Sequence, residues 1–466
     1  MYILMLIIFV LGYTAIALEH SIGIDKAASA LITGVLCWTV YVLGAMNIVD
    51  FDSIPASLIA LFSEGGIEAT DKHHMILHYV TEHQILEQLS EIASILFFLI
   101  GAMTIVELID AHEGFTVITD RIKTRNKVKL MWIVCVLTFF LSAALDNLTT
   151  TIVMVSLLRK LIDDQQHRWL YAGLVVIAAN AGGAWSPIGD VTTTMLWIGG
   201  QITTSHIITG IILPSLVCMF VPLLWLSFRL KGEVRRPRRV EQADHYLDPT
   251  SKFERNFVFF AGIGGLLMVP VYKTVTHLPP FMGMMLSLGL VWLLTDILHK
   301  SKNKEFRTKY SVVGVIRKID TPSVLFFLGI LLAVGSLQGA GHLGQMANFL
   351  DTTIGTDTPN GIYGVSIVIG ILSSIVDNVP LVAASMGMYP LADVGYFMQD
   401  GLFWEFLAYC AGTGGSALII GSAAGVAAMG LEGISFGWYL KNISRLAILG
   451  YLAGAFIYIV EHMVFG

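Results

Sequence analysis

Residues 180–194 read Asn-Ala-Gly-Gly-Ala-Trp-Ser-Pro-Ile-Gly-Asp-Val-Thr-Thr-Thr, a polar and glycine-rich run inside an otherwise apolar stretch. Glycine and proline let a membrane helix unwind, and unwound backbone is tolerated at membrane depth only around a polar cavity. The run therefore predicts a helix that is broken near the middle of a bilayer. Its carboxylate, amide, hydroxyl and freed carbonyl oxygens form a hard ligand set that suits Na⁺ or Li⁺.

The composition of the whole chain indicates a membrane protein. Of its 466 residues, 55% are hydrophobic and 13% charged, whereas about 25% are charged in a typical soluble domain. The mean hydropathy is +0.73, and a net charge of -6 argues against a nucleic-acid partner. The four cysteines lie in apolar stretches without metal-ligand spacing, so we expect buried thiols. We expect no cofactor, and no nucleophile–base set indicates an enzyme.

Apolar segments predict ten membrane crossings, since about 20 apolar residues span a bilayer core. The first crossing has no cleavage-site pattern, and we take it as a retained span. Two further apolar stretches, 130–158 and 361–391, are interrupted at their centres by Asp146-Asn147 and by Asp377-Asn378-Val379-Pro380. The ten crossings are 2–18, 27–46, 89–111, 168–189, 205–228, 255–272, 279–298, 322–340, 403–425 and 443–463.

Lysine and arginine placement predicts the orientation. Basic clusters flank 130–158 on both sides, but no lysine or arginine occurs from 319 to 440. Because basic loops stay in the cytoplasm, the first interrupted stretch is expected to be a re-entrant hairpin from the cytoplasm and the second one from outside. The N-terminus and the acidic loop 47–87 are then outside, and 231–254 is a basic cytoplasmic linker.

Three sequence matches indicate an internal repeat. Ser94 matches Ser323, Ser142-x-x-x-Asp-Asn matches Ser373-x-x-x-Asp-Asn, and Gly182-Gly matches Gly414-Gly, at offsets of 229, 231 and 232. The hairpin reading puts an odd number of crossings between the copies, so the second copy is inverted. The first repeat covers 1–230, with a hairpin at 130–158 and a broken helix at 168–200. The second covers 255–466, with a hairpin at 361–391 and a broken helix at 403–428. This architecture is typical of secondary transporters, and there is no nucleotide-binding loop of the P-loop type.

Polar residues inside these four segments are the candidate functional residues, because a carboxylate at membrane depth is costly and usually functional. A site that holds either Na⁺ or a proton gives antiporter chemistry, and Asp146 and Asp190 are the first candidates for the exchange. The candidate ion and proton ligands are Asp146, Asn147, Thr150, Asn180, Ser186, Asp190, Thr193, Ser373, Asp377, Asn378, Thr413 and Ser416. Na⁺ is expected at Asp146, Asn147, Asp190, Asp377 and Asn378, and Glu107 is a candidate proton relay. Helix breaks are expected at Gly182, Gly183, Pro187, Gly189, Pro380, Gly414 and Gly415.

Structural roles for some of these residues remain open. An aspartate before a threonine run is also a good helix N-cap, and intramembrane hydroxyls often bond to their own helix. Histidine as a residue type is suited to sensing pH near neutrality, which makes the histidines of the outer loop (His73, His74, His78 and His83) candidate pH sensors, but a solvated loop also explains them.

The motifs at 142–151, 180–194 and 373–380 resemble those of NhaD-type sodium/proton antiporters, over nearly the whole chain. That family belongs to the ion transporter superfamily, with divalent anion/sodium symporters and arsenite permeases. The resemblance implies exchange of Na⁺, and of Li⁺, for H⁺ across a bacterial inner membrane. It also implies a homodimer whose mobile transport domains work in elevator fashion. An anion symporter or an arsenite exporter is the alternative within the superfamily; an ion channel or a receptor is an alternative from another class.

Overall fold

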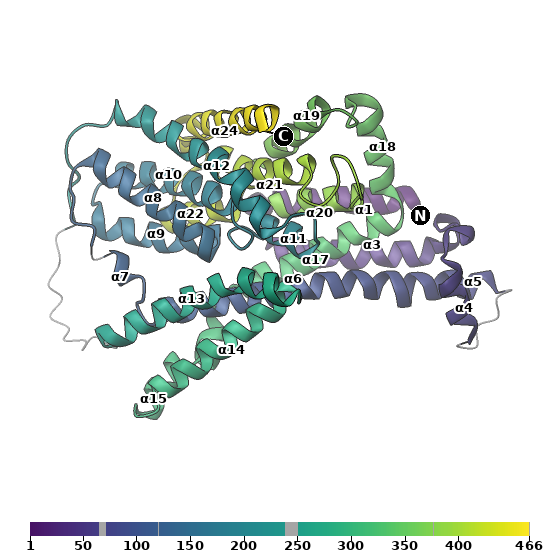
Figure 1. Cartoon of the computed structure of the whole chain (residues 1–466), viewed down its shortest axis with the longest axis horizontal. Helices are drawn as coiled ribbons and strands as arrows, with labels where there is room; N and C mark the ends of the chain where they lie inside the picture. Colours follow the sequence, from purple (N-terminus) through teal and green to yellow (C-terminus); the bar gives the residue numbers. More distant parts are fainter. Residues whose placement is uncertain (65–70, 120, 238–249, 376, 466) are drawn as a thin grey trace. The chain divides into compact units, whose positions relative to one another are not determined.

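The computed structural model describes residues 1–64, 71–119, 121–237, 250–375 and 377–465, and its regular elements there are helices (Figure 1). Parts of the expected outer loop (65–70), of the basic linker (238–249) and of the second hairpin tip (Val376) lie outside these residues. The all-α membrane fold is confirmed, because eight described helices are long and apolar enough to span a bilayer. They are α3 (Lys26–Ile48), α5 with α6 (Lys72–Ala111), α8 (Lys127–Leu145), α12 (Thr204–Ser227), α13 (Lys252–Thr276), α14 (Pro280–Leu298), α17 (Thr321–Gly339) and α24 (Ser444–Phe465).

The other expected crossings are shorter or broken helices. The first is α1 (Tyr2–Ala17), whose 16 residues extend about 24 Å at 1.5 Å per residue. The crossing expected over 168–189 is α10 (Gln165–Ala184), followed by α11 (Val191–Ile198). The crossing expected over 403–425 is divided between α21 (Leu402–Gly414) and α22 (Ala423–Glu432). Further helices are α2 (Glu19–Ile22), α7 (Thr116–Thr119), α15 (Lys304–Tyr310), α16 (Val312–Val315), α18 (His342–Ile354) and α23 (Phe436–Asn442).

The prediction of a loop over 47–87 is wrong for most of the described residues in that range, because they are helical. After α4 (Ala56–Glu64), α5 (Lys72–His78) continues through a π-helical segment (Tyr79–Gln84) directly into α6 (Ile85–Ala111). Carboxylates one turn from the histidines support this helix. His78 Nδ1 lies 3.1 Å from Glu82, and His83 Nδ1 lies 3.4 Å from Glu87. The histidine pattern is therefore that of a helix surface.

The chain divides into two compact units. The first comprises residues 1–96, 320–353 and 383–390, and its centre is the packing of α3 against α1 and α17. A side-chain carbon added at Gly34 would lie 2.5 Å from the carbonyl oxygen of Gly329. Small residues at this crossing therefore let the two backbones approach closely, as is common between membrane helices.

The second unit comprises residues 97–319, 354–382 and 391–466. It holds the helices of both expected hairpins: α8 and α9 (Asn147–Leu161), which pack on each other, and α19 (Pro359–Leu372) with the start of α20 (Asn378–Met388). Helices α8, α9 and α10 pack side by side (Figure 1). In the same unit α19 packs on α21, and α12 packs along α24. All the candidate ligands predicted from the sequence belong to this unit.

Candidate ion-binding site

The first hairpin turns at Asp146, whose φ of 86° lies in a region that few residues other than glycine adopt. Its carboxylate caps α9: Oδ1 accepts the backbone N–H of Thr149 and Oδ2 accepts the Thr149 hydroxyl, both at 2.8 Å. The capping role that the sequence left open is therefore present in the structure. The turn places the next residue, Asn147, in the interior at 5% exposure.

The first broken helix is tied to this hairpin. Helix α10 ends at Ala184 and α11 begins at Val191. In the gap, the Ser186 hydroxyl donates to the carbonyl oxygen of Ala143 at 2.6 Å. The Thr193 hydroxyl donates to the carbonyl oxygen of Ser186 at 2.9 Å. A side-chain carbon at Gly182 would lie 2.2 Å from the carbonyl oxygen of Phe139, so only glycine lets α10 approach α8 this closely.

Asp190 lies at the centre of the candidate site and is only 2% exposed. Its Oδ1 accepts the backbone N–H and the hydroxyl of Thr192, each at 3.0 Å. Its Oδ2 accepts Nδ2 of Asn147 at 2.7 Å, and Nδ2 of Asn378 lies 3.4 Å from both carboxylate oxygens. Amides from both hairpins therefore converge on one buried carboxylate, and hydrogen bonds to an ionised acceptor are the strong kind.

Asn180 connects this carboxylate to the second half of the chain. It is fully buried, and its Oδ1 accepts Nδ2 of Asn147 at 3.0 Å. Its Nδ2 donates to the hydroxyl oxygens of Ser416 and Ser422, both at 2.9 Å. A continuous network thus runs from Asp190 through two amides to two serines beside the second helix break.

The packing around the second break repeats that around the first. The Ser373 hydroxyl donates to the carbonyl oxygen of Ala411 at 2.8 Å, as Ser142 does to that of Ala179 at 2.6 Å. A side-chain carbon at Gly414 would lie 2.0 Å from the carbonyl oxygen of Gly370, which matches the approach at Gly182. A single 3₁₀ turn, Gly415–Ala417, follows α21.

The two halves differ in chemistry. At the same offset of 232, Asp190 corresponds to Ser422 and Asn180 to Gly412. A side-chain carbon at Gly412 would lie 3.9 Å from Oδ2 of Asp190, so the carboxylate faces a position without a side chain. Asp377 stands at the second tip, where its Oδ1 accepts the backbone N–H of Val379 at 3.2 Å.

The remaining candidates are less closely connected to Asp190. The Thr413 hydroxyl donates to the carbonyl oxygen of Tyr409 in its own helix at 2.6 Å. Thr150 is fully buried, and its hydroxyl has no hydrogen-bond partner among the described residues. Glu107 lies 3.9 Å from Nζ of Lys318 and is 26% exposed; no hydrogen bond links it to the network among the described residues. Pro380 lies in the first turn of α20, where proline is tolerated.

Three contributors were missing from the predicted set. Ser422 and Thr192 stand inside the matched motifs, so the motifs were the signal that pointed to them. Lys273 of α13 donates to the carbonyl oxygen of Trp197 at 2.6 Å and lies 4.4 Å from the centre of that indole ring. It therefore holds the end of α11 opposite Asp190, and a lone lysine late in an apolar helix was its signal.

The donor set has a clear chemical bias. Carboxylate, amide and hydroxyl oxygens surround the centre, and the described hydrogen bonds of the network involve no lysine or arginine. Oxygen ligands suit hard cations, and a buried carboxylate needs such a partner or a proton. The arrangement is therefore suited to a small cation or a proton.

Comparison with known proteins agrees with this chemistry. Residues 4–404 match the family model described as citrate transporter. Sodium/proton antiporter 1 of Arabidopsis thaliana is 46% identical over 98% of this chain and 72% of its own length. Sodium/proton antiporter 2 of the same plant is 43% identical over 98% of this chain and 99% of its own length. The Na⁺/H⁺ antiporter NhaD of Vibrio cholerae is 28% identical over 98% of this chain and 91% of its own length. The chain therefore belongs to the citrate transporter family and, within it, to the NhaD-type sodium/proton antiporters.

Proposed function

We propose that this protein exchanges Na⁺, and also Li⁺, for H⁺ at Asp190. The observation that carries the proposal is the convergence of Asn147 and Asn378, one from each hairpin, on that single buried carboxylate. A charge buried in this way must be paired or neutralised. Na⁺ and a proton both neutralise it, and occupancy by one removes the charge that attracts the other. Competition at one carboxylate is thus sufficient for exchange, and the names of the relatives support the choice of Na⁺ and H⁺.

The two asparagines supply a means of adapting to either occupant. The terminal torsion of an asparagine is broad and roughly two-fold, and both faces of the amide can bond. With the N–H groups toward Asp190, the amides stabilise the carboxylate. Turned by half a rotation, Asn147 and Asn378 present oxygens to a cation that sits on Asp190. The Ser416 and Ser422 hydroxyls accept or donate, so they accommodate Asn180 in either orientation.

The repeated contacts at the two breaks support a duplicated transport unit. We propose inverted repeats that move in elevator fashion within a homodimer, in a bacterial inner membrane and with the N-terminus outside. The offset of 231 to 232 between equivalent contacts supports the repeats, and the lysine- and arginine-free stretch 319–440 supports the orientation. The elevator motion, the homodimer and the inner membrane are what the resemblance to NhaD-type antiporters implies. The transported ions, the bilayer and the second copy would then be the partners of this chain.

Proton flux in sealed vesicles tests the function. The full chain is reconstituted with a pH-sensitive dye, and Na⁺ or Li⁺ is added against a preformed proton gradient. We expect both ions to dissipate the gradient and Asp190→Asn to abolish the effect. Asp296→Asn is the control, because it removes an exposed carboxylate from α14 and should leave exchange intact. Full exchange by Asp190→Asn would overturn the proposal, and Na⁺-coupled uptake of labelled citrate without proton exchange would favour the symporter instead.

A further inference from the structure

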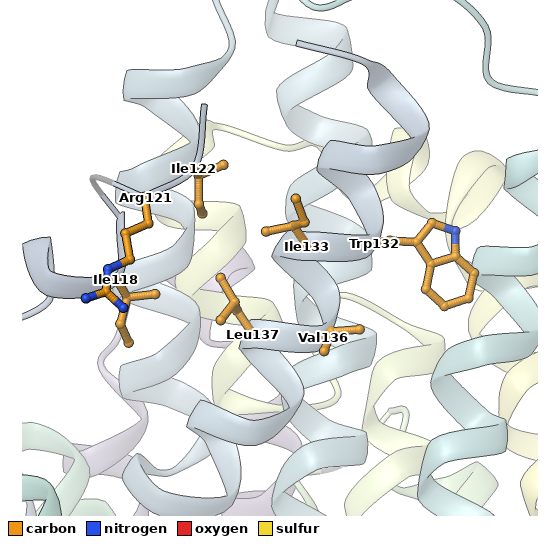
Figure 2. Close-up of a pocket in the computed structure, with 7 residues that line it drawn as sticks. All are labelled: Ile118, Arg121, Ile122, Trp132, Ile133, Val136 and Leu137. Atoms are coloured by element: carbon orange, nitrogen blue, oxygen red, sulfur yellow. The ribbon is translucent and has the colours of Figure 1, made fainter. Parts of the chain in front are cut away.

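An apolar recess of about 550 Å³ lies against α8, and none of its lining residues belongs to the ion site (Figure 2). One wall is formed by α7, with Ile118, and by the residues that follow it, with Ile122; the other is α8, with Ile133 and Leu137. Figure 2 shows Ile122, Ile133 and Leu137 between the two walls, with Arg121 on the first wall and Trp132 on the side of α8 that points away from that wall. The recess is open at the surface, and Ile133 is 38% exposed.

The depth of the recess matches one leaflet of a bilayer. Helix α8 is one of the candidate membrane spans and begins at Lys127. Leu137 stands ten residues farther on, which is about 15 Å along a helix and about half of a 30 Å hydrocarbon core. An open apolar recess at that depth faces lipid tails, so water or a soluble metabolite is not the natural occupant.

The mouth of the recess is basic. Arg121 is exposed and makes no ion pair within the described residues. Three more exposed cations follow within eight residues: Lys123, Arg125 and Lys129. The wall is anchored from the linker, because Nη2 of Arg236 donates to the carbonyl oxygen of Ile122 at 3.0 Å. An apolar slot flanked by an exposed guanidinium, which has no ion pair within the described residues, is complementary to an acyl chain with an anionic headgroup. Basic pockets of this kind recognise anionic lipids.

We propose that this recess binds one anionic phospholipid, with its phosphate on Arg121 and one acyl chain between Ile122 and Leu137. The guanidinium presents several N–H donors to phosphate oxygens, and the apolar walls replace lipid neighbours along the chain. The site is independent of the exchange reaction, so its occupancy does not depend on the chemistry at Asp190.

Quenching by brominated lipids tests the site in the full-length protein. The chain is reconstituted in phosphatidylcholine bilayers that contain rising fractions of dibrominated phosphatidylglycerol or dibrominated phosphatidylcholine. The signal of Trp132 is the difference between the wild type and Trp132→Phe. We expect phosphatidylglycerol to reach half-maximal quenching at a mole fraction about fivefold lower, as expected for one basic residue near the surface.

Variants separate a site from general attraction to the surface. Arg121→Gln should remove the preference, and Arg121→Lys should keep most of it. Arg307→Gln is the matched control, because Arg307 is exposed on α15 and makes no ion pair within the described residues; the preference should persist. Equal quenching by the two lipids in the wild type would overturn the proposal. An equal loss of the phosphatidylglycerol preference in Arg121→Gln and Arg307→Gln would overturn it as well.

Discussion

Removal of the Asn147 side chain should weaken the cation site strongly. Asn147 donates at 2.7 Å to Asp190 and at 3.0 Å to Asn180. A hydrogen bond to a charged group contributes about 1.5–3 kcal/mol and one between neutral groups about 1 kcal/mol. Asn147→Ala also removes the amide oxygen that would turn toward the cation. If that oxygen contributes as much as a hydrogen bond to a charged group, about 1.5–3 kcal/mol, the half-saturating Na⁺ concentration rises roughly 10- to 10²-fold.

Proteoliposomes provide the measurement, because proton release can be followed over a wide range of Na⁺ concentrations. The matched control is Asn442→Ala on α23, where an exposed asparagine donates only to a backbone carbonyl oxygen. A double variant with Asn180→Ala adds a second test. The two residues share one hydrogen bond, so their combined cost should be smaller than the sum by about 1 kcal/mol.

Two results would refute this reasoning. One is a half-saturating Na⁺ concentration for folded Asn147→Ala within about threefold of that of the wild type, below the factor expected for loss of the amide oxygen. The other is strict additivity of the two alanine substitutions, which would mean that the amide pair transmits nothing to the site.

Three further predictions concern the framework and the helix ends. Gly414→Ala places a carbon 2.0 Å from the carbonyl oxygen of Gly370. We expect the free energy of unfolding, followed by thermal unfolding, to fall by about 1–3 kcal/mol. Glu432→Gln removes a buried carboxylate that binds two arginine Nε atoms at 2.8 and 3.0 Å. Because one arginine is half exposed, we expect the free energy of unfolding to fall by about 1–3 kcal/mol, less than for a fully buried ion pair. Hydrogen bonds from the backbone N–H of His167 and then from its ring hold the pKa of Asp164 below its usual range. A carboxylate with a lowered pKa stabilises the folded protein at higher pH. That contribution is lost as the pH falls through the lowered pKa. Asp164→Ala should therefore lower the melting temperature at pH 7 but not at a pH below the lowered pKa of Asp164.

Controls are available for each of these changes. Gly430→Ala adds a carbon with nothing within 4 Å, and its unfolding should match that of the wild type. For Glu432→Gln, added salt should narrow the difference from the wild type; a melting temperature identical to that of the wild type would contradict the importance of the ion pairs. For Asp164→Ala, an equal deficit at both pH values would show that the carboxylate charge is irrelevant.

Local signals in the sequence determined where the helices stop. Glycine, proline and paired Asp-Asn residues interrupt apolar stretches, and the turn at Asp146 and the breaks over 185–190 and 415–422 occur beside these signals. Of the residues expected at the breaks, Gly182, Gly183 and Gly414 instead lie in the last turns of α10 and α21. Composition and run length alone indicated an all-helical membrane protein. These features depend on residues close in sequence, so one-dimensional reasoning could reach them. The sequence-based prediction failed for the histidine segment that continues into α6, where the helix is formed by charged and polar residues and so lacks an apolar pattern.

Only the tertiary structure decided what each polar side chain contacts. Asp146 and Asp190 read alike as aspartates before threonines, yet Asp146 caps its helix through Thr149 while Asp190 also accepts amides from both hairpins. The hydrogen bonds from Asn180 to Ser416 and Ser422 join residues more than 230 positions apart in the sequence. Such contacts follow from the angle and depth at which helices cross, which are set by close approaches such as Gly182 on Phe139. The sequence alone determined which groups enter the membrane; packing decided that one carboxylate stands at their centre, because side-chain direction is fixed only when the helices meet.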